Sequence, residues 1–469
     1  MTLDARTKRL LPWLVAIAFF MQTLDGSILN TALPAMARDL GESPLRMQSV
    51  VIAYLLTVAL LIPASGWLAD RFGTQRVFIA AIVLFSFGSL LCALSRSLPL
   101  LVGARIVQGV GGALLLPVGR LAILRAFPRA ELLAALAFVA VPGLVGPLVG
   151  PTLGGWLVEV ASWHWVFLIN LPVGLVGVLV ALRFMPDLRG AAVRFDGWGF
   201  ALFSCGLVLV SLALQGLGER AIGAAVSLVM LVAGLAAMVG YWLHAARTER
   251  PLFSLALFRI PSFAIGLAGN LFARLGSGAM PYLMPLYLQV ALGLSPAAAG
   301  MSLIPTAIGA MVCKAFAEPL IRRFGYRRVL VTNTLLLGAM IASFSLTGPA
   351  LPHPALLAML FVFGLINSLQ FTAMNTLTLG DLDAANASGG NSLLSVVMQL
   401  SMSLGVAAAA ALLAAFTGVP AEPASPLVLR AFHTTFACVG LLSAIAAFIF
   451  FQLGRGDTPS APPTVTDPT

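Results

Sequence analysis

Charged side chains are scarce in this sequence. Of its 469 residues only 9% are Asp, Glu, Lys or Arg, whereas 60% are apolar. In soluble domains about a quarter of the residues are charged. No long polar stretch interrupts the apolar runs, so little remains from which to build a separate soluble domain. The composition therefore indicates an all-α polytopic membrane protein, with room for many spans of about 20 residues each.

Cysteine and histidine are also few, and neither is clustered. The four cysteines (Cys92, Cys205, Cys313 and Cys438) lie in separate apolar runs. Their positions offer neither disulfide nor metal-ligand spacing, so we expect small hydrophobic side chains, no metal and no cofactor. The four histidines are scattered near the ends of apolar runs. This pattern argues against a membrane enzyme, which usually gathers acidic or histidine side chains at the interface.

The sequence contains no G-x-x-x-x-G-K-[ST] loop, which argues against an ATP-driven pump. A net charge of +10 would be compatible with binding to nucleic acid. Basic residues beside membrane spans explain it more simply, because they set orientation. We therefore expect neither ATP nor nucleic acid as a partner.

Fourteen apolar segments are long enough to cross a bilayer. They are residues 11–33, 47–68, 76–95, 98–124, 133–158, 164–184, 197–217, 221–243, 262–290, 297–318, 328–348, 354–379, 391–416 and 431–453. Of the 27 basic residues, 18 lie in segments on the same side as the two termini and 5 on the opposite side. The positive-inside rule then predicts two cytoplasmic termini.

A short internal repeat divides the chain. "RFGTQRVF" (71–78) returns as "RFGYRRVL" (323–330), each time after the second span of a six-span set. Internal repeats around a central site are typical of secondary transporters. We predict a six-helix bundle over 1–195, two inserted transmembrane helices over 196–250, a second six-helix bundle over 251–455 and a disordered cytoplasmic tail over 456–469. The inserted helices carry little polarity and should pack peripherally against lipid.

Five motifs carry a family resemblance. They are "LDGSILNTALP" (24–34), "GWLADRFGTQRVF" (66–78), "LVGARIVQGVGGA" (101–113), "GPLVGPTLGGWL" (146–157) and "WHWVFLINLPVG" (163–174). Over nearly its whole length the chain resembles the fourteen-span drug:proton antiporter branch of the major facilitator superfamily. The loop motif departs from the usual pattern at Thr74-Gln75-Arg76. The resemblance implies multidrug-type efflux coupled to protons, by a monomer in the bacterial inner membrane.

Two of these motifs predict gating residues. Glycines spaced by four in 146–155 let helix backbones approach closely in lipid, and prolines among them remove backbone donors. A packed but pliable helix would serve gating, although ordinary packing glycines are the alternative. The resemblance also implies a conformational latch after the second span. The gating candidates are Asp70, Arg71, Gly73, Gly146, Pro147, Gly150, Pro151, Gly154 and Gly155.

Asp25 stands in an otherwise apolar span, about 12 Å from its outer end at 1.5 Å per residue. Arg105 lies at a similar depth in the antiparallel fourth span, so the two could face each other. Burial favours a protonated Asp25, whereas Arg105 favours the carboxylate. A carboxyl balanced in this way can carry a proton; a permanent ion pair that fixes helix register is the alternative.

Polar side chains at helical spacing mark one face of the first, ninth, twelfth and thirteenth spans. As a set they favour a polar cavity between the halves. The substrate-cavity candidates are Gln22, Asn30, Asn270, Arg274, Asn367, Asn375, Asn391 and Gln399. With Asp25 protonated, Arg105 and Arg274 leave the midplane positive. We therefore keep an alternative function open, namely proton-coupled export of an organic anion or a metal–carboxylate complex such as citrate.

Overall fold

The computed structural model describes residues 5–190, 194–219, 223–383, 386–417 and 424–454. Within these residues the secondary structure is helical, and no strand occurs. The tail predicted over 456–469 lies outside the described residues. The all-helical class expected from the composition is confirmed.

Among the described residues, thirteen helices are long and apolar enough to cross a membrane. The predicted ninth span, 262–290, is not among them. It contains α10 (Pro261–Leu286), which is 26 residues long and would span about 39 Å at 1.5 Å per residue. Because α10 carries Asn270 and Arg274, it is more polar than its neighbours. It packs inside the bundle against α14, α15 and α16.

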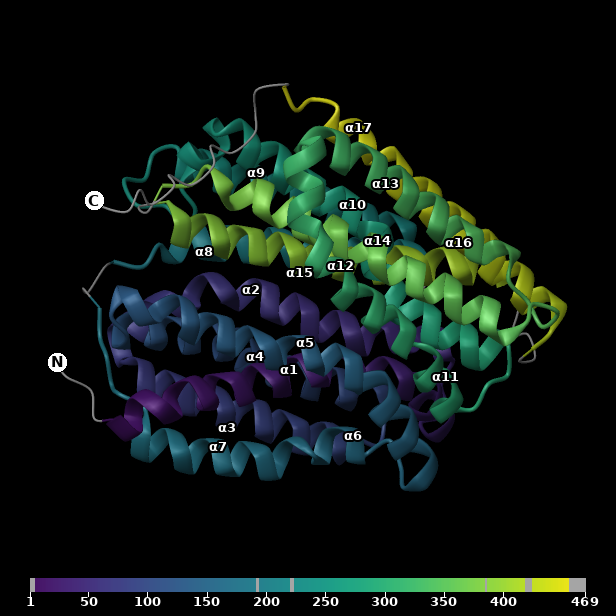
Figure 1. Cartoon of the computed structure of the whole chain (residues 1–469), viewed down its shortest axis with the longest axis horizontal. Helices are drawn as coiled ribbons and strands as arrows, with labels where there is room; N and C mark the ends of the chain where they lie inside the picture. The colour runs from purple at the N-terminus through teal and green to yellow at the C-terminus, as the bar shows by residue number, and fades with distance from the viewer. Residues whose placement is uncertain (1–4, 191–193, 220–222, 384–385, 418–423, 455–469) are drawn as a thin grey trace.

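The N-terminal helices form one layer, in the lower half of Figure 1. The long α1 packs against α5, and α4 packs against α2 and α3. The predicted sixth span is broken into two helices, α6 and α7. The elements are α1 (Ala5–Asp39), η1 (Pro44–Met47), α2 (Gln48–Phe72), α3 (Thr74–Ala93), α4 (Leu98–Ala126), α5 (Arg129–Val160), α6 (Trp165–Leu168) and α7 (Asn170–Phe184).

The C-terminal helices form the other layer, in the upper half of Figure 1. Here α10 packs against α15, α12 against α14 and α13 against α16. With α10, the elements are η2 (Leu255–Arg259), η3 (Tyr287–Ala291), α11 (Pro296–Ser302), α12 (Ile304–Phe324), α13 (Tyr326–Ser343), η4 (Phe344–Leu346), α14 (His353–Gly380), α15 (Ala387–Thr417), α16 (Pro426–Ile445) and α17 (Ala447–Phe450).

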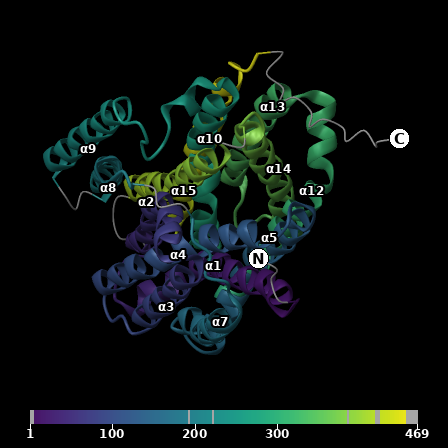
Figure 2. The same ribbon diagram turned by 90° about the vertical axis from the view of Figure 1, so that its left-hand side faces the viewer.

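Two helices between these layers, α8 (Gly197–Glu219) and α9 (Ala224–Ala245), form a hairpin at the periphery (Figure 2). α8 contacts α15 and, more lightly, α2, whereas the apolar side chains of α9 are largely exposed, as expected of a lipid-facing helix. Asp196 ties the hairpin to the next segment, because its carboxylate accepts from His244 and from the backbone N–H of Gly199 and Leu252. Burial opposes ionisation, but these hydrogen bonds hold the pKa of Asp196 below its usual value.

The two layers meet along α2 and α15 and again where α5 meets α11. An apolar cluster joins Leu56 of α2 to Leu207 of α8 and Leu393 of α15. We call the end of the molecule that carries α11 the α11 end, and the opposite end, where α1 begins, the terminal end (Figure 1). Hydrogen bonds between described residues cross from one layer to the other at the α11 end. They are Thr152 Oγ1 to Gly300 O, Tyr282 Oη to Leu45 O, Gln289 Nε2 to Thr31 O and Ala297 N to Glu159 Oε1.

Candidate functional site

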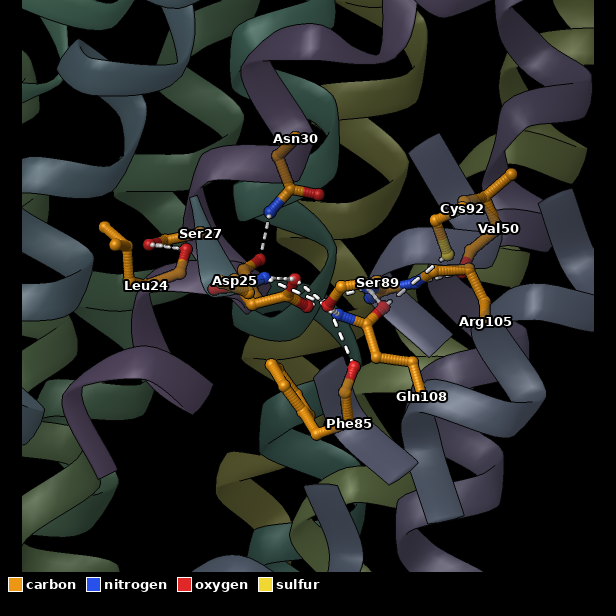
Figure 3. Close-up of polar contacts among 12 residues, drawn as sticks. Leu24, Asp25, Ser27, Asn30, Val50, Phe85, Ser89, Cys92, Arg105 and Gln108 are labelled. Atoms are coloured by element: carbon orange, nitrogen blue, oxygen red, sulfur yellow. Dashed lines mark hydrogen bonds and ion pairs between the residues drawn. The ribbon is translucent and has the colours of Figure 1, made fainter. Parts of the chain in front are cut away.

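Asp25 lies in the middle of α1 and is 1% exposed. Its Oδ2 is 2.7 Å from Nη1 of Arg105 on α4, which is also 1% exposed (Figure 3). The antiparallel geometry predicted from sequence is therefore correct. A charged pair buried this deeply costs free energy of desolvation, so it requires good geometry and further hydrogen bonds.

Those further hydrogen bonds come from two amide side chains. Gln108 Nε2 donates to Asp25 Oδ1 at 2.7 Å, and Asn170 Nδ2 donates to the same oxygen at 3.1 Å. Both amides also reach Ser89 Oγ, at 2.8 and 3.2 Å. The carboxylate thus accepts from three donors on two helices, α4 and α7. These hydrogen bonds offset part of the free energy that burying the charged pair costs.

Arg105 is held on every side. Its Nη1 also donates to Gln108 Oε1 at 2.6 Å, and its Nε donates to the Val50 carbonyl at 3.4 Å. The guanidinium lies over the ring of Tyr54, 4.2 Å from the centroid, and 5.9 Å from that of Phe167. Such stacking suits arginine better than lysine. The guanidinium is therefore fixed in position beside Asp25.

A second buried cation, Arg274 on α10, has a different environment. Its Nε donates to Asn270 Oδ1 at 2.9 Å, and its guanidinium lies 4.3 Å from the centroid of Phe371. Its Nη2 is buried and has no hydrogen-bond partner. Among the described residues, no carboxylate lies within ion-pair distance of Arg274, and Asp25 does not pair with it. An unpaired buried guanidinium is costly, which marks it as a candidate binding group.

The other cavity candidates are not gathered into one cluster. Asn270 is fully buried and bonds Gly266 O and Thr378, so it is partly structural. Asn30 donates to Gly26 O within α1. Gln22 and Asn375 each keep a buried carbonyl oxygen without a partner. Three further candidates are partly or fully exposed: Asn367, Asn391 and Gln399.

The glycines of α5 contact two different neighbours. An added Cβ on Gly146, Gly150 or Gly154 would fall within 2.5 Å of α1. The close helix approach predicted for them is therefore confirmed, and α1 is the partner. Gly155 instead faces the other layer, because its Cβ would lie 2.1 Å from the Pro296 carbonyl. The helix α5 continues unbroken through Pro147 and Pro151. The gating role of this segment stays a prediction.

Gly300, in the opposite layer, makes the reciprocal contact to that of Gly155. A Cβ on Gly300 would lie 2.3 Å from the Pro151 carbonyl, so the two backbones touch at the α11 end. Sequence reasoning missed this residue, because the short α11 carries no motif. The contact leaves no room for side chains on either helix.

The loop after α2 is built around an ion pair at the terminal end. Asp70 pairs with Arg125 of α4, and Arg71 lies 5.5 Å from the centroid of Trp67. Gly73 has a φ of +95°, and a Cβ there would overlap the carboxylate of Asp187. Arg125 thus supplies Asp70 with a basic partner from within the same layer. The latch role stays a prediction.

Gln108 and Asn170 are the functional candidates that sequence reasoning missed. Both stand in motifs that were recognised, "LVGARIVQGVGGA" and "WHWVFLINLPVG". Gln108 is three residues after Arg105 and so lies on the same helix face, which spacing alone could have indicated. Asn170 comes from a distant helix, and only the fold brings it to Asp25. Within the described residues no group of three His, Cys, Asp or Glu side chains could hold a metal.

Two helical layers, thirteen apolar helices among the described residues and an ion pair buried within the N-terminal layer fit a multi-pass membrane transporter of the secondary type. The family model described as Major Facilitator Superfamily matches the chain twice, over residues 15–267 and 266–468. The chain belongs to this superfamily. The double match agrees with the repeat at 71–78 and 323–330.

Three bacterial relatives are similar over most of their length. The chain is 50% identical to one from Serratia proteamaculans over 95% of this chain and 94% of that protein. It is 49% identical to one from Yersinia enterocolitica (93% and 93%) and 48% identical to one from Pectobacterium atrosepticum (93% and 94%). All three carry the name "Putative multidrug resistance protein MdtD".

Solved structures share the fold. A bacterial homologue of the human lysosomal transporter Spinster, inward-facing and occupied, superposes with a TM-score of 0.70 at 14% identity, covering 96% of this chain and 97% of that one. A POT family transporter in complex with 5-aminolevulinic acid gives 0.68 at 15% identity, covering 94% and 95%.

Replacing Gly155 by valine should disfavour the arrangement in this structure, because the new side chain would collide with the backbone of α11. Spin labels at Arg96→Cys and Ala350→Cys, in a cysteine-free background, would report the distance across the α11 end. We expect Gly155→Val to add a population at longer distance. Gly103→Val is the matched control, since a Cβ there meets nothing within 4 Å. Identical distance distributions in both variants would contradict this reading.

Proposed function

We propose that this protein exports small molecules in exchange for protons, as a multidrug-type efflux transporter that works by alternating access. The observation that carries the proposal is the buried Asp25, which is ionisable, lies within a membrane span and is joined by hydrogen bonds to three helix-borne donors. Ionisable groups in membrane interiors are costly and mark proton or substrate pathways. The names of the MdtD relatives support the multidrug class.

Proton coupling would act through the charge of Asp25. With Asp25 ionised, Arg105, Gln108 and Asn170 draw α1, α4 and α7 together. Protonation removes the charge that Arg105 faces and converts one carboxylate oxygen from acceptor to donor, so the hydrogen bonds from the amides must rearrange. The free energy of this rearrangement couples proton binding to the relation between the two layers, because α1 and α5 are packed together and α5 carries Gly155.

Alternating access further requires that the α11 end separate. The contacts of Gly155 with Pro296 and of Gly300 with Pro151 are small and contain no side-chain interlock, so they can part at modest cost. The hydrogen bonds across this end would exchange for water. We propose that the termini are cytoplasmic, in a bacterial inner membrane, that the α11 end faces outward, and that one chain is sufficient.

A specific observation favours a second candidate, export of an organic anion or a metal–carboxylate complex such as citrate. Arg274 is buried without a carboxylate partner among the described residues, and its Nη2 is unsatisfied. A carboxylate of the cargo would supply the missing charge and a bidentate acceptor. For a lipophilic cation, the same guanidinium would be repulsive.

Asp25→Asn should abolish proton-driven transport, because the side chain keeps its shape but loses its proton-carrying group. Everted membrane vesicles with an acidified lumen, given a lipophilic cationic dye, would measure accumulation with and without an uncoupler. Since an unpaired buried Arg105 costs about 3–5 kcal/mol, the double variant Asp25→Asn/Arg105→Gln is the folding control and should also be inactive. Normal accumulation by Asp25→Asn would refute proton coupling at this residue.

The cargo can be assigned with the same vesicles and Arg274→Gln. If an anion is exported, labelled citrate should accumulate in wild-type vesicles, and the variant should lose about tenfold to a hundredfold, as expected for a charged hydrogen bond worth about 1.5–3 kcal/mol. Dye transport should then be absent in both. If a cationic drug is exported, dye accumulation should persist in Arg274→Gln and citrate should never accumulate. The second result would reject the anion candidate.

A further inference from the structure

A cleft of about 310 Å³ opens between the first turns of α1 and the start of α5, at the terminal end. Its walls include Arg9, Pro12 and Trp13 from α1, and Glu131, Ala134 and Phe138 from α5. The cleft is far along α1 from Asp25 and belongs to neither the ion-pair network nor the contact at the α11 end. No role in transport has been assigned to it above.

Along the α1 wall the side chains change from charged to apolar toward the middle of the helix. Arg6, Arg9, Trp13 and Ile17 are separated by three, four and four residues, so they share one helix face, and all four are exposed. From Arg9 to Ile17 the face runs from cationic through aromatic to aliphatic over about 12 Å. On a membrane helix this order matches a phospholipid, with its phosphate outermost and its acyl chain toward the midplane.

The α5 wall also runs from a charged residue through an aromatic to an aliphatic one, but its charged residue is acidic. Glu131 lies at the outer rim, Phe138 follows two turns later and Val141 one turn beyond, all exposed. Trp13 and Phe138 meet edge to face across the cleft, with ring centroids 4.7 Å apart. Tryptophan is enriched at the depth of lipid headgroups, where its ring bridges polar and apolar layers. The two rings therefore mark the level at which a lipid glycerol would lie.

The charges at the rim leave a surplus of positive charge. Glu131 is engaged by Lys8, whose Nζ is 3.3 Å from the carboxylate. Neither Arg6 nor Arg9 has an acidic partner within 4 Å among the residues that the structure describes. Guanidinium groups bind phosphate in bidentate fashion, and basic pockets between membrane helices select anionic headgroups.

We propose that this cleft binds one anionic phospholipid. Its phosphate would lie on Arg9 and Arg6, its glycerol beside Trp13 and Phe138, and one acyl chain along Ile17 and Val141. The lipid would join α1 to α5 at the terminal end, where the glycine contacts of 146–154 no longer hold the two helices together. The protein would thereby prefer anionic over zwitterionic lipid of the same chain length.

Native mass spectrometry of the full chain in neutral detergent tests the proposal with phosphatidylglycerol and phosphatidylcholine of identical chains. We expect phosphatidylglycerol to bind more tightly, and Arg6→Gln/Arg9→Gln to weaken it about tenfold without affecting phosphatidylcholine. Arg96→Gln/Arg430→Gln is the matched control, because it removes two exposed basic side chains at the α11 end. An excess of inorganic phosphate should not displace the lipid.

A second readout keeps the test independent of how the double variant folds. Brominated phosphatidylglycerol should quench Trp13, isolated as the difference in fluorescence between wild type and Trp13→Phe. Equal phosphatidylglycerol affinity in the two double variants, no preference over phosphatidylcholine in wild type, full displacement by phosphate, or an unquenched Trp13 would each overturn the proposal.

Discussion

A carboxylate inside a membrane span must be either neutralised or surrounded by donors, and the rest of this structure depends on how that constraint is met at Asp25. Arg105 neutralises the charge, and Gln108 and Asn170 occupy the oxygen that Arg105 leaves free. To bring these donors together, α1, α4 and α7 must pack within hydrogen-bonding distance at the same depth. The N-terminal layer is therefore organised around one ionisable group.

Close packing of α1 against α5 links Asp25 to the rest of the structure. The glycines at 146, 150 and 154 press α5 against α1, so a change near Asp25 is transmitted to a neighbouring helix rather than absorbed by loose side chains. α5 in turn reaches the opposite layer through Gly155 at the α11 end. A buried charge, a tightly packed helix pair and a contact between layers thus form a continuous physical path. The coupling along that path is the proposal that experiment must test.

Much of this could be read from the sequence, because composition and helical spacing constrain membrane proteins strongly. The helical class, the pairing of Asp25 with Arg105 and the close approach of α5 to a neighbour followed from local patterns, whereas thirteen of the fourteen predicted spans are apolar enough to cross a membrane in the part that the structure describes. Asn170 and Gly300 did not, since each acts on a residue far away in the chain, and no local rule identifies that partner. The cavity role of the polar stripes stays a prediction: Asn30 bonds its own helix, and Asn391 lies exposed.

The most direct test of this account is the rate of proton-driven transport in Asn170→Leu. The variant removes one of the three donors to Asp25, a loss of about 1 kcal/mol, so proton-driven transport should slow about fivefold. Asn333→Leu, which removes a buried amide that bonds Ile366 and Gln370 instead, should leave the rate unchanged. An unchanged rate in Asn170→Leu, or an equal loss in Asn333→Leu, would contradict the claim that proton coupling depends on the network around Asp25.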